Sequence, residues 1–181
     1  MKSLLRYQIS EFDCAPTTFN NALIYFFERE ELSPLLLNII NKNTMDYDDF
    51  KGTSVNATKN LAEELSLISD LEVIRKAKEE VNLETLEKLL ADGFVCIIRV
   101  KLWVDHYVLI TKCLDKAYIF DPYFVDVKIF DDDDEIEVKK SSYYNRVVSF
   151  KRIFEEEDKN YSLVELEKRD SVFIKRKIDQ K

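Results

Sequence analysis

The sequence predicts an α+β domain in which a group of helices precedes an antiparallel sheet. In the first half, apolar residues recur at the three- and four-residue spacing of buried helices. The second half consists of short apolar, β-branched runs separated by turn residues, and this segregation is typical of α+β domains. The length of 181 residues, with 46% hydrophobic and 34% charged residues, suits a single globular domain over residues 1–181.

The expected helices lie in the first half of the chain. An apolar stripe defines the first one: Phe19, Leu23, Phe26 and Phe27. Pro16 lies near its start, where a missing N–H costs nothing. Three further helices are expected: one opened by Ser33-Pro34, one over about 54–67, and one that begins at an Asn82 cap and stops at Gly93.

The expected strands follow Gly93. Their ranges are 94–100, 106–113, 117–121, 125–130, 146–150 and 172–175. The second and third flank a short turn at 114–116 and predict a hairpin. Ser162 and Glu165 have the spacing of a capping box for a short helix, so residues 151–181 are expected to add one helix and one strand.

Charge and composition exclude several classes of protein. The net charge of −8 gives the chain no general attraction to phosphate backbones, so no nucleic-acid partner is expected. No apolar run approaches the length of a membrane span, and charge interrupts residues 1–6 too early for a signal peptide. Three cysteines, none in a C-x-x-C spacing, favour a reduced, cytoplasmic location. The single histidine, His106, excludes the H-E-x-x-H zinc peptidases.

One cysteine lies where a nucleophile would be expected. Cys14 is at the junction of a loop and the first helix, and the free N–H groups at a helix start favour an anion such as a thiolate. On position alone, a small apolar cysteine packed at a helix end is the simpler interpretation. A cysteine nucleophile also needs a base, and His106 is the candidate that this chain offers.

Two further side chains complete a possible catalytic group. Asp121 ends the strand after the histidine strand, so its carboxylate could hold the imidazole in one tautomer; the alternative is an ordinary turn-initiating Asp-Pro. Gln8 lies six residues before Cys14, close enough to face the same cavity. Its side-chain amide and the backbone N–H of Cys14 could stabilise an oxyanion.

These residues form a known pattern. The Gln-x5-Cys element, QISEFDC at residues 8–14, followed by an apolar helix, resembles the papain-like cysteine peptidases. Within that group it is most similar to the bacteriocin-processing, double-glycine leader peptidases and their stand-alone relatives. The segments NLETLEKLLADGFVCIIRV and HYVLITKCLDKAYIFDP also fit, so the similarity covers about residues 5–125 in the family's order of Cys, His and Asp.

The resemblance implies a papain-like fold, in which the nucleophile helix packs on a C-terminal antiparallel sheet. It assigns Cys14 as nucleophile, His106 as base, Asp121 as orienting carboxylate and Gln8 to the oxyanion hole. The implied reaction is hydrolysis of a peptide or amide bond through an acyl-enzyme, with no metal or organic cofactor. Trp103 could line the substrate groove, although a partly buried loop aromatic is the simpler interpretation.

The sequence departs from the family pattern in three ways. Ala15 follows the cysteine where these peptidases usually have glycine, and the chain carries no transporter domains, which leaves the double-glycine substrate open. In addition, a tight hairpin would pair Asp121 with Ile110, four residues or about 13 Å from His106. A bulge, a twist or another register must close that gap; otherwise Asp126 is the better-placed carboxylate.

Two other functions remain open at this stage. A transglutaminase-like acyltransferase would pass the acyl group to an amine instead of water. A peptide-binding module on a peptidase-like scaffold would bind a partner without turnover, and its binding would not depend on Cys14.

Overall fold

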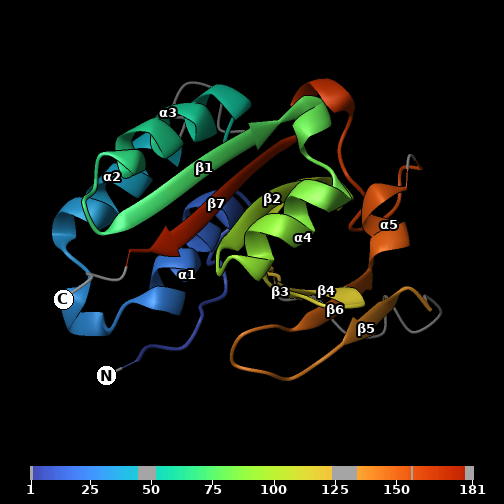
Figure 1. The fold of residues 1–181 in the computed structure, drawn as a ribbon, viewed down its shortest axis with the longest axis horizontal. Helices are drawn as coiled ribbons and strands as arrows, with labels where there is room; N and C mark the ends of the chain where they lie inside the picture. The colour runs from blue at the N-terminus through green and yellow to red at the C-terminus, as the bar shows by residue number, and fades with distance from the viewer. Residues whose placement is uncertain (1, 45–51, 124–133, 156, 178–181) are drawn as a thin grey trace.

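The computed structural model contains an antiparallel sheet with helices on both faces (Figure 1). It describes residues 2–44, 52–123, 134–155 and 157–177. Within these residues the sheet has seven strands in the order β1-β7-β2-β3-β4-β6-β5, and every neighbouring pair is antiparallel. The strands are β1 (Leu71–Ala77), β2 (Val95–Leu102), β3 (Val104–Cys113), β4 (Lys116–Phe120), β5 (Ile136–Val138), β6 (Arg146–Ser149) and β7 (Asp170–Arg176).

The described helices divide between the two faces of the sheet. They are α1 (Cys14–Phe26), α2 (Pro34–Thr44), α3 (Val55–Ser66), α4 (Leu83–Ala91) and α5 (Phe150–Phe154), with short 3-10 turns at Arg29–Glu31, Lys78–Glu80 and Leu166–Lys168. Helices α1, α2 and α3 share one hydrophobic cluster with the sheet, and α4 and α5 share the other. In Figure 1 α4 lies in front of β2 while α1 lies behind the sheet. The expectation of helices preceding an antiparallel sheet is confirmed at this level.

Helix α1 is fixed by the apolar stripe that the sequence shows. Phe19 and Leu23 are fully buried, and Phe27 is almost so. Each such side chain contributes about 1.5–3 kcal/mol on burial. The Thr18 hydroxyl also donates to the Tyr107 carbonyl of β3 at 3.0 Å. These contacts set the start of α1 against the strand that carries the histidine.

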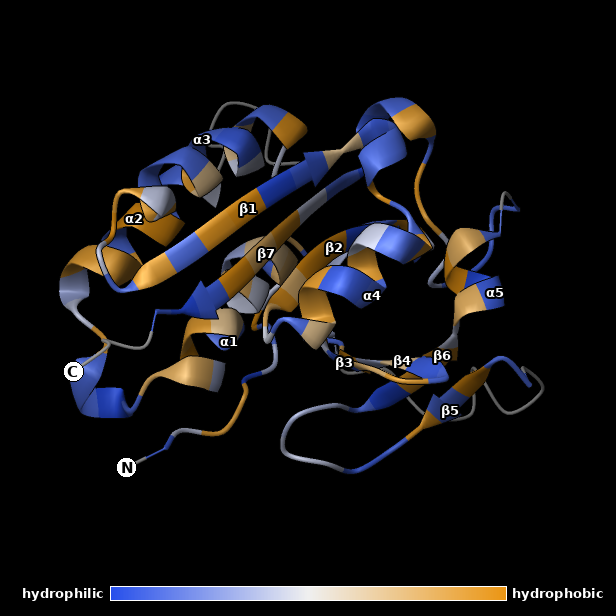
Figure 2. Ribbon diagram, in the orientation of Figure 1, coloured by the Kyte–Doolittle hydropathy of each residue, from blue (hydrophilic) through white to orange (hydrophobic). Residues whose placement is uncertain are grey.

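Other helix boundaries also follow from local chemistry. The Ser54 side chain caps α3 and the Asn82 side chain caps α4, each accepting a backbone N–H three residues on. Beyond α4, Gly93 has a φ of +88°, the left-handed conformation that glycine adopts readily. When the ribbon is coloured by residue hydropathy, the apolar residues are concentrated on the central strands (Figure 2).

Strand β7 differs most from the sequence expectation of an added C-terminal strand. It lies between β1 and β2, so the last described strand is an interior strand next to the edge strand β1. Strands β1 and β5 and the short helix α5 were not expected from the sequence. The expected capping box at Ser162 is wrong: the Ser162 hydroxyl bonds to Lys159, and Leu163 forms a bridge with Val100 of β2. The expected strand at 125–130 lies outside the described residues.

The β3–β4 hairpin contains the irregularity that the triad requires. The pairing shifts between Ile110 and Lys112, leaving Thr111 as a bulge, and Leu109 faces Phe120. Continuing this register sets Asp121 opposite Val108, two residues nearer to His106 than a regular tight hairpin would. The bulge supplies one of these residues, and the pairing of Cys113 with Ala117 supplies the other. The Thr111 hydroxyl stabilises the bulge by donating to the Tyr143 carbonyl at 3.0 Å.

None of the helices in the described part of the chain has the length and apolar character needed to cross a membrane.

Candidate active site

The loop before α1 is ordered by one carboxylate. Asp13 accepts the backbone N–H groups of Ile9 and Ser10 at 3.1 and 2.8 Å. Burial alone would raise the pKa of Asp13, but these hydrogen bonds lower it. Asp13 makes no side-chain cap hydrogen bond to the helix. The positive end of α1 therefore remains available to the residue that begins it, Cys14.

The Cys14 thiol lies just beneath the surface, with 9% of the residue exposed. Burial raises the pKa of the thiol, but a hydrogen bond from His106 and the charge of its ring lower it, and the net change is a lowered pKa. The neighbouring loop residues Ile9 and Phe12 are exposed. The thiol therefore combines a lowered pKa with a position close to the protein surface.

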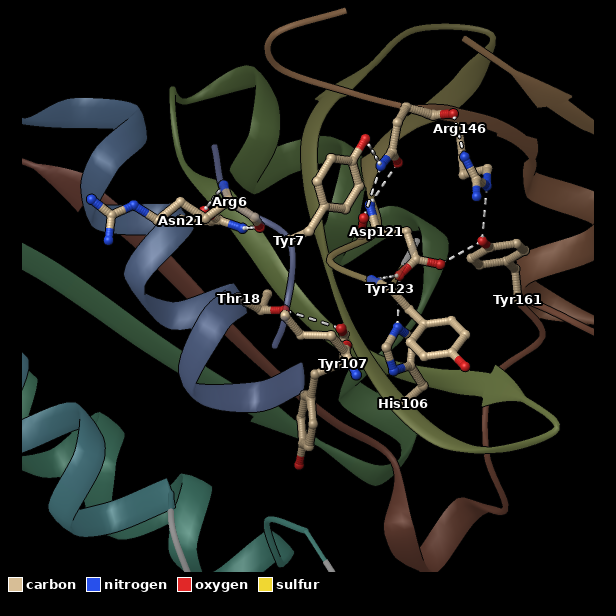
Figure 3. A network of polar contacts seen from close by, with 12 residues as sticks. Arg6, Tyr7, Thr18, Asn21, His106, Tyr107, Asp121, Tyr123, Arg146 and Tyr161 are labelled. Carbon is tan, nitrogen blue, oxygen red and sulfur yellow. Dashed lines mark hydrogen bonds and ion pairs between the residues drawn. The ribbon is translucent and has the colours of Figure 1, made fainter. Parts of the chain in front are cut away.

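His106 bridges the cysteine and the aspartate. Its Nε2 lies 2.8 Å from Asp121 Oδ1, and both side chains are buried (Figure 3). This contact occupies Nε2, which leaves Nδ1 as the ring nitrogen available to the Cys14 sulfur. Burial lowers the pKa of His106, yet the Asp121 carboxylate and the Cys14 sulfur outweigh burial and raise it to about 10. The lowered pKa of Cys14 and the raised pKa of His106 both favour the thiolate–imidazolium form of the pair.

Asp121 is fully buried and every part of it is bonded. Its Oδ1 also accepts the Tyr123 backbone N–H at 2.8 Å, and its Oδ2 accepts the Tyr161 hydroxyl at 2.5 Å. Its backbone N–H and C=O are both bonded to the side-chain amide of Asn145 at 2.8 Å. Burial raises the pKa of Asp121, but the charge and hydrogen bond of His106, with Tyr161, lower it.

Gln8 lies near this group, but the hydrogen bond of its side-chain amide goes to the loop and not to the Cys14 sulfur. Its backbone N–H donates to the Pro122 carbonyl at 2.9 Å, which brings Gln8 beside the residue after Asp121. Its side-chain Nε2 donates to the Ser10 carbonyl at 2.7 Å. The role of Gln8 in an oxyanion hole therefore stays a prediction.

Trp103 is connected to the site through an aromatic row. It forms the one-residue link between β2 and β3, and it is 58% exposed. Its ring meets the Tyr123 ring edge-on at 6.3 Å, and Tyr123 meets the His106 ring in the same way at 6.3 Å. The Tyr123 hydroxyl reaches Glu11 at 3.4 Å. Trp103 thus lies at the border of the site, and its contact with substrate stays a prediction.

The structure brings together the three residues of the expected triad, whereas Asp126 lies outside the described residues. Sequence reasoning missed Tyr123, Asn145 and Tyr161. Asn145 precedes an apolar strand and had a weak signal as a polar residue at a strand start, but Tyr161 had none. Among the described residues, no group of three or more His, Cys, Asp or Glu side chains has the arrangement of a metal site.

Comparison of the chain with protein-family models, with curated proteins and with solved structures found no match.

Proposed function

We propose that the chain is a cysteine peptidase or amidase of the papain-like kind. The observation that carries the proposal is the geometry at His106: one ring nitrogen lies 2.8 Å from the buried Asp121 carboxylate, which leaves the other for the Cys14 thiol at a helix start. This is the arrangement of a nucleophile, a base and an orienting group. The similarity of residues 5–125 to the leader-peptidase branch supports the same reaction.

The proposed reaction has two halves. The Cys14 thiolate attacks the carbonyl carbon of an amide, and the C=O electron pair moves to the oxygen. As the C–N bond breaks, the His106 imidazolium gives its Nδ1 proton to the leaving amine, and a thioester remains on Cys14. Neutral His106 then takes a proton from water, the resulting hydroxide attacks the thioester, and the acid product leaves with the thiolate restored.

Asp121 serves both halves without itself gaining a proton. It keeps the Nε2–H of His106 directed toward itself, so Nδ1 always faces the sulfur. Its negative charge stabilises the imidazolium that precedes amine departure. Burial of both groups strengthens this effect because little water screens them.

Alkylation by iodoacetamide tests the activated nucleophile, and the chain supplies its own reference thiol. Burial raises the pKa of Cys113 to about 11, although this cysteine is partly exposed, whereas the Cys14 pKa is lowered. At pH 6 we expect Cys14 to be alkylated at least about tenfold faster than Cys113, as measured by peptide mass mapping. Loss of this preference in His106→Gln would support the pair.

Two results would contradict the proposal: equal labelling of Cys14 and Cys113 at pH 6, or a Cys14 preference that survives His106→Gln. Once a cleavable peptide amide is found by library screening, Cys14→Ala should abolish its turnover. An added amine that appears in an amide product would show acyl transfer instead of hydrolysis.

A further inference from the structure

The C-terminal part of the chain, beyond the similarity to leader peptidases, contributes to the proposed catalytic group. Tyr161 is fully buried and lies between two charged side chains. Its hydroxyl donates to Asp121 Oδ2 at 2.5 Å and accepts from Arg146 Nε at 3.2 Å (Figure 3). The chain of contacts therefore runs from His106 through Asp121 and Tyr161 to Arg146.

The direction of these hydrogen bonds is fixed by charge. Burial and the Asp121 carboxylate raise the pKa of Tyr161 well above its ordinary value, so the phenol keeps its proton. Arg146 is a donor only, and the ionised carboxylate is an acceptor only. Tyr161 must then accept from Arg146 and donate to Asp121, which satisfies the second carboxylate oxygen in a site that water does not reach.

The backbone around Tyr161 is built to hold it there. Tyr161 has a φ of +66°, a conformation that is an outlier for a bulky residue and persists only where surrounding contacts impose it. Its N–H donates to the Lys101 carbonyl at 2.6 Å, and the Lys101 N–H donates to the Ser162 carbonyl at 2.8 Å. Leu163 then bridges to Val100, which itself pairs with His106. The turn is thus attached to β2 beside the histidine.

We propose that Tyr161, supported by Arg146, is a positioning residue that keeps the Asp121 carboxylate ionised and directed toward His106. The inference rests on the proposed function. Without the hydroxyl, Oδ2 would lose its donor inside the protein, and a buried carboxylate without donors takes up a proton more readily. The thiolate–imidazolium pair would then be lost at a higher pH than in the wild-type protein.

The groups that face Asp121 come from four places in the fold. Three contact it directly: His106 on β3, Tyr123 after β4, and Tyr161 in the turn before Leu166–Lys168. Arg146 on β6 acts through Tyr161, and Cys14 of α1 lies beyond His106. Of these groups, Cys14 and Asp121 have lowered pKa values and His106 has a raised one.

The experiment is a double-mutant cycle on Tyr161→Phe and Asp121→Asn, read as the pH dependence of Cys14 alkylation by iodoacetamide between pH 4 and 8. The acid midpoint is the pH at which the alkylation rate of Cys14 has fallen to half of its plateau value. We expect Tyr161→Phe to move this acid midpoint upward by at least about 0.5 pH unit. Asp121→Asn should move it further, and adding Tyr161→Phe to Asp121→Asn should change nothing more, since Tyr161 acts through the carboxylate.

A matched control separates positioning from stability. Tyr107 is the other buried tyrosine near the site; its hydroxyl bonds to Thr58 and its ring points away from His106 (Figure 3). Tyr107→Phe should lower the melting temperature as Tyr161→Phe does, without moving the acid midpoint. If Tyr161→Phe does not fold, Arg146→Lys, which keeps the charge but loses the Nε donor, should give a smaller shift in the same direction.

Each outcome has one meaning. An unchanged acid midpoint in Tyr161→Phe, with a shifted midpoint in Asp121→Asn, would overturn the role of Tyr161 and leave the triad intact. Unchanged midpoints in both would overturn the proposed function as well. Additive shifts in the double variant would show that Tyr161 acts independently of Asp121 and would also overturn the inference. The ring nitrogens of His106, the single histidine, offer a second readout by NMR, where Tyr161→Phe should lower the pH at which the imidazolium loses its proton.

Discussion

The side chain of Asn145 pairs with the backbone of Asp121 through two hydrogen bonds of 2.8 Å, so that it replaces a strand partner at the point where β4 ends. Asp121 is fully buried. A side chain used in this way fixes the position and direction of the Asp121 carboxylate, because the buried Asp121 N–H and C=O depend on it for their hydrogen bonds.

Asn145→Ala should therefore destabilise the protein strongly. Removing the amide leaves a buried donor and a buried acceptor unpaired, and each costs about 1–3 kcal/mol. We expect a loss of about 2–6 kcal/mol in the free energy of unfolding, measured by urea denaturation. Asn43→Ala is a suitable control because Asn43 donates a single hydrogen bond to the Ile39 carbonyl of its own helix. A loss no larger than that of the control would contradict the bracing role of Asn145.

Gln8 can be tested by comparing two reactions of the same sulfur. Attack on an amide creates an oxyanion, whereas alkylation by iodoacetamide takes place at a saturated carbon and creates none. If Gln8 serves the oxyanion, Gln8→Ala should slow hydrolysis of a screened peptide amide by about 10²-fold and leave alkylation of Cys14 unchanged. Gln8→Glu should be at least as damaging to hydrolysis.

The hydrogen bond of Gln8 to Ser10 points to an alternative role, in which Gln8 holds the loop in place. A Gln8 that only braces the loop before α1 would slow both reactions together, since the position of Cys14 would change. Equal losses in hydrolysis and alkylation would remove Gln8 from the oxyanion hole.

Trp103 joins two strands with a φ of +61°, which is unfavourable for any residue with a Cβ. Comparing Trp103→Gly with Trp103→Ala isolates the backbone contribution because both variants lose the ring. We expect the glycine variant to be about 1 kcal/mol more stable than the alanine variant, the reverse of their usual order inside regular structure. Thermal melting measures the difference, and a more stable alanine variant would show that this link is not strained.

Much of the fold follows from local pattern, but its irregular parts do not. The α1 stripe and the Asn82 cap of α4 were readable because each depends on residues within one or two turns. Strand β1 was missed because it is at the edge of the sheet, where Glu72 and Lys76 interrupt the apolar pattern. The interior position of β7, between β1 and β2, depends on pairing with strands about 75–100 residues earlier, which no local pattern records.

The site divides in the same way. The residue types of the expected triad and their order were visible, since the chain has only 3 cysteines and 1 histidine, and Asp121 ends the strand that follows the histidine strand. Their contact depends on the Thr111 bulge, which changes the register by one residue and has no glycine or proline to mark it. Tyr161 was hidden because its hydroxyl reaches Asp121 only when the turn after α5 is attached to β2.

The pH dependence of stability provides a last test of the His106–Asp121 pair, best made in a Cys14→Ala background, where the thiol no longer titrates. The charge and hydrogen bond of Asp121 raise the pKa of His106 in the folded protein, where it is about 10 with Cys14 present, above 6.5 in the unfolded chain. The folded state therefore binds one more proton over the interval between these values. This stabilisation is fully present below pH 6.5 and is lost as the pH rises through the folded pKa.

We expect the free energy of unfolding of Cys14→Ala to fall by up to about 1.4 kcal/mol per pH unit above pH 6.5, with an upper limit below pH 10 because the sulfur no longer contributes. In Cys14→Ala with His106→Gln this slope should disappear, although the protein should be less stable throughout because Asp121 loses its partner. Equal slopes in the two variants between pH 6.5 and 9 would mean that the folded protein does not hold His106 as an imidazolium.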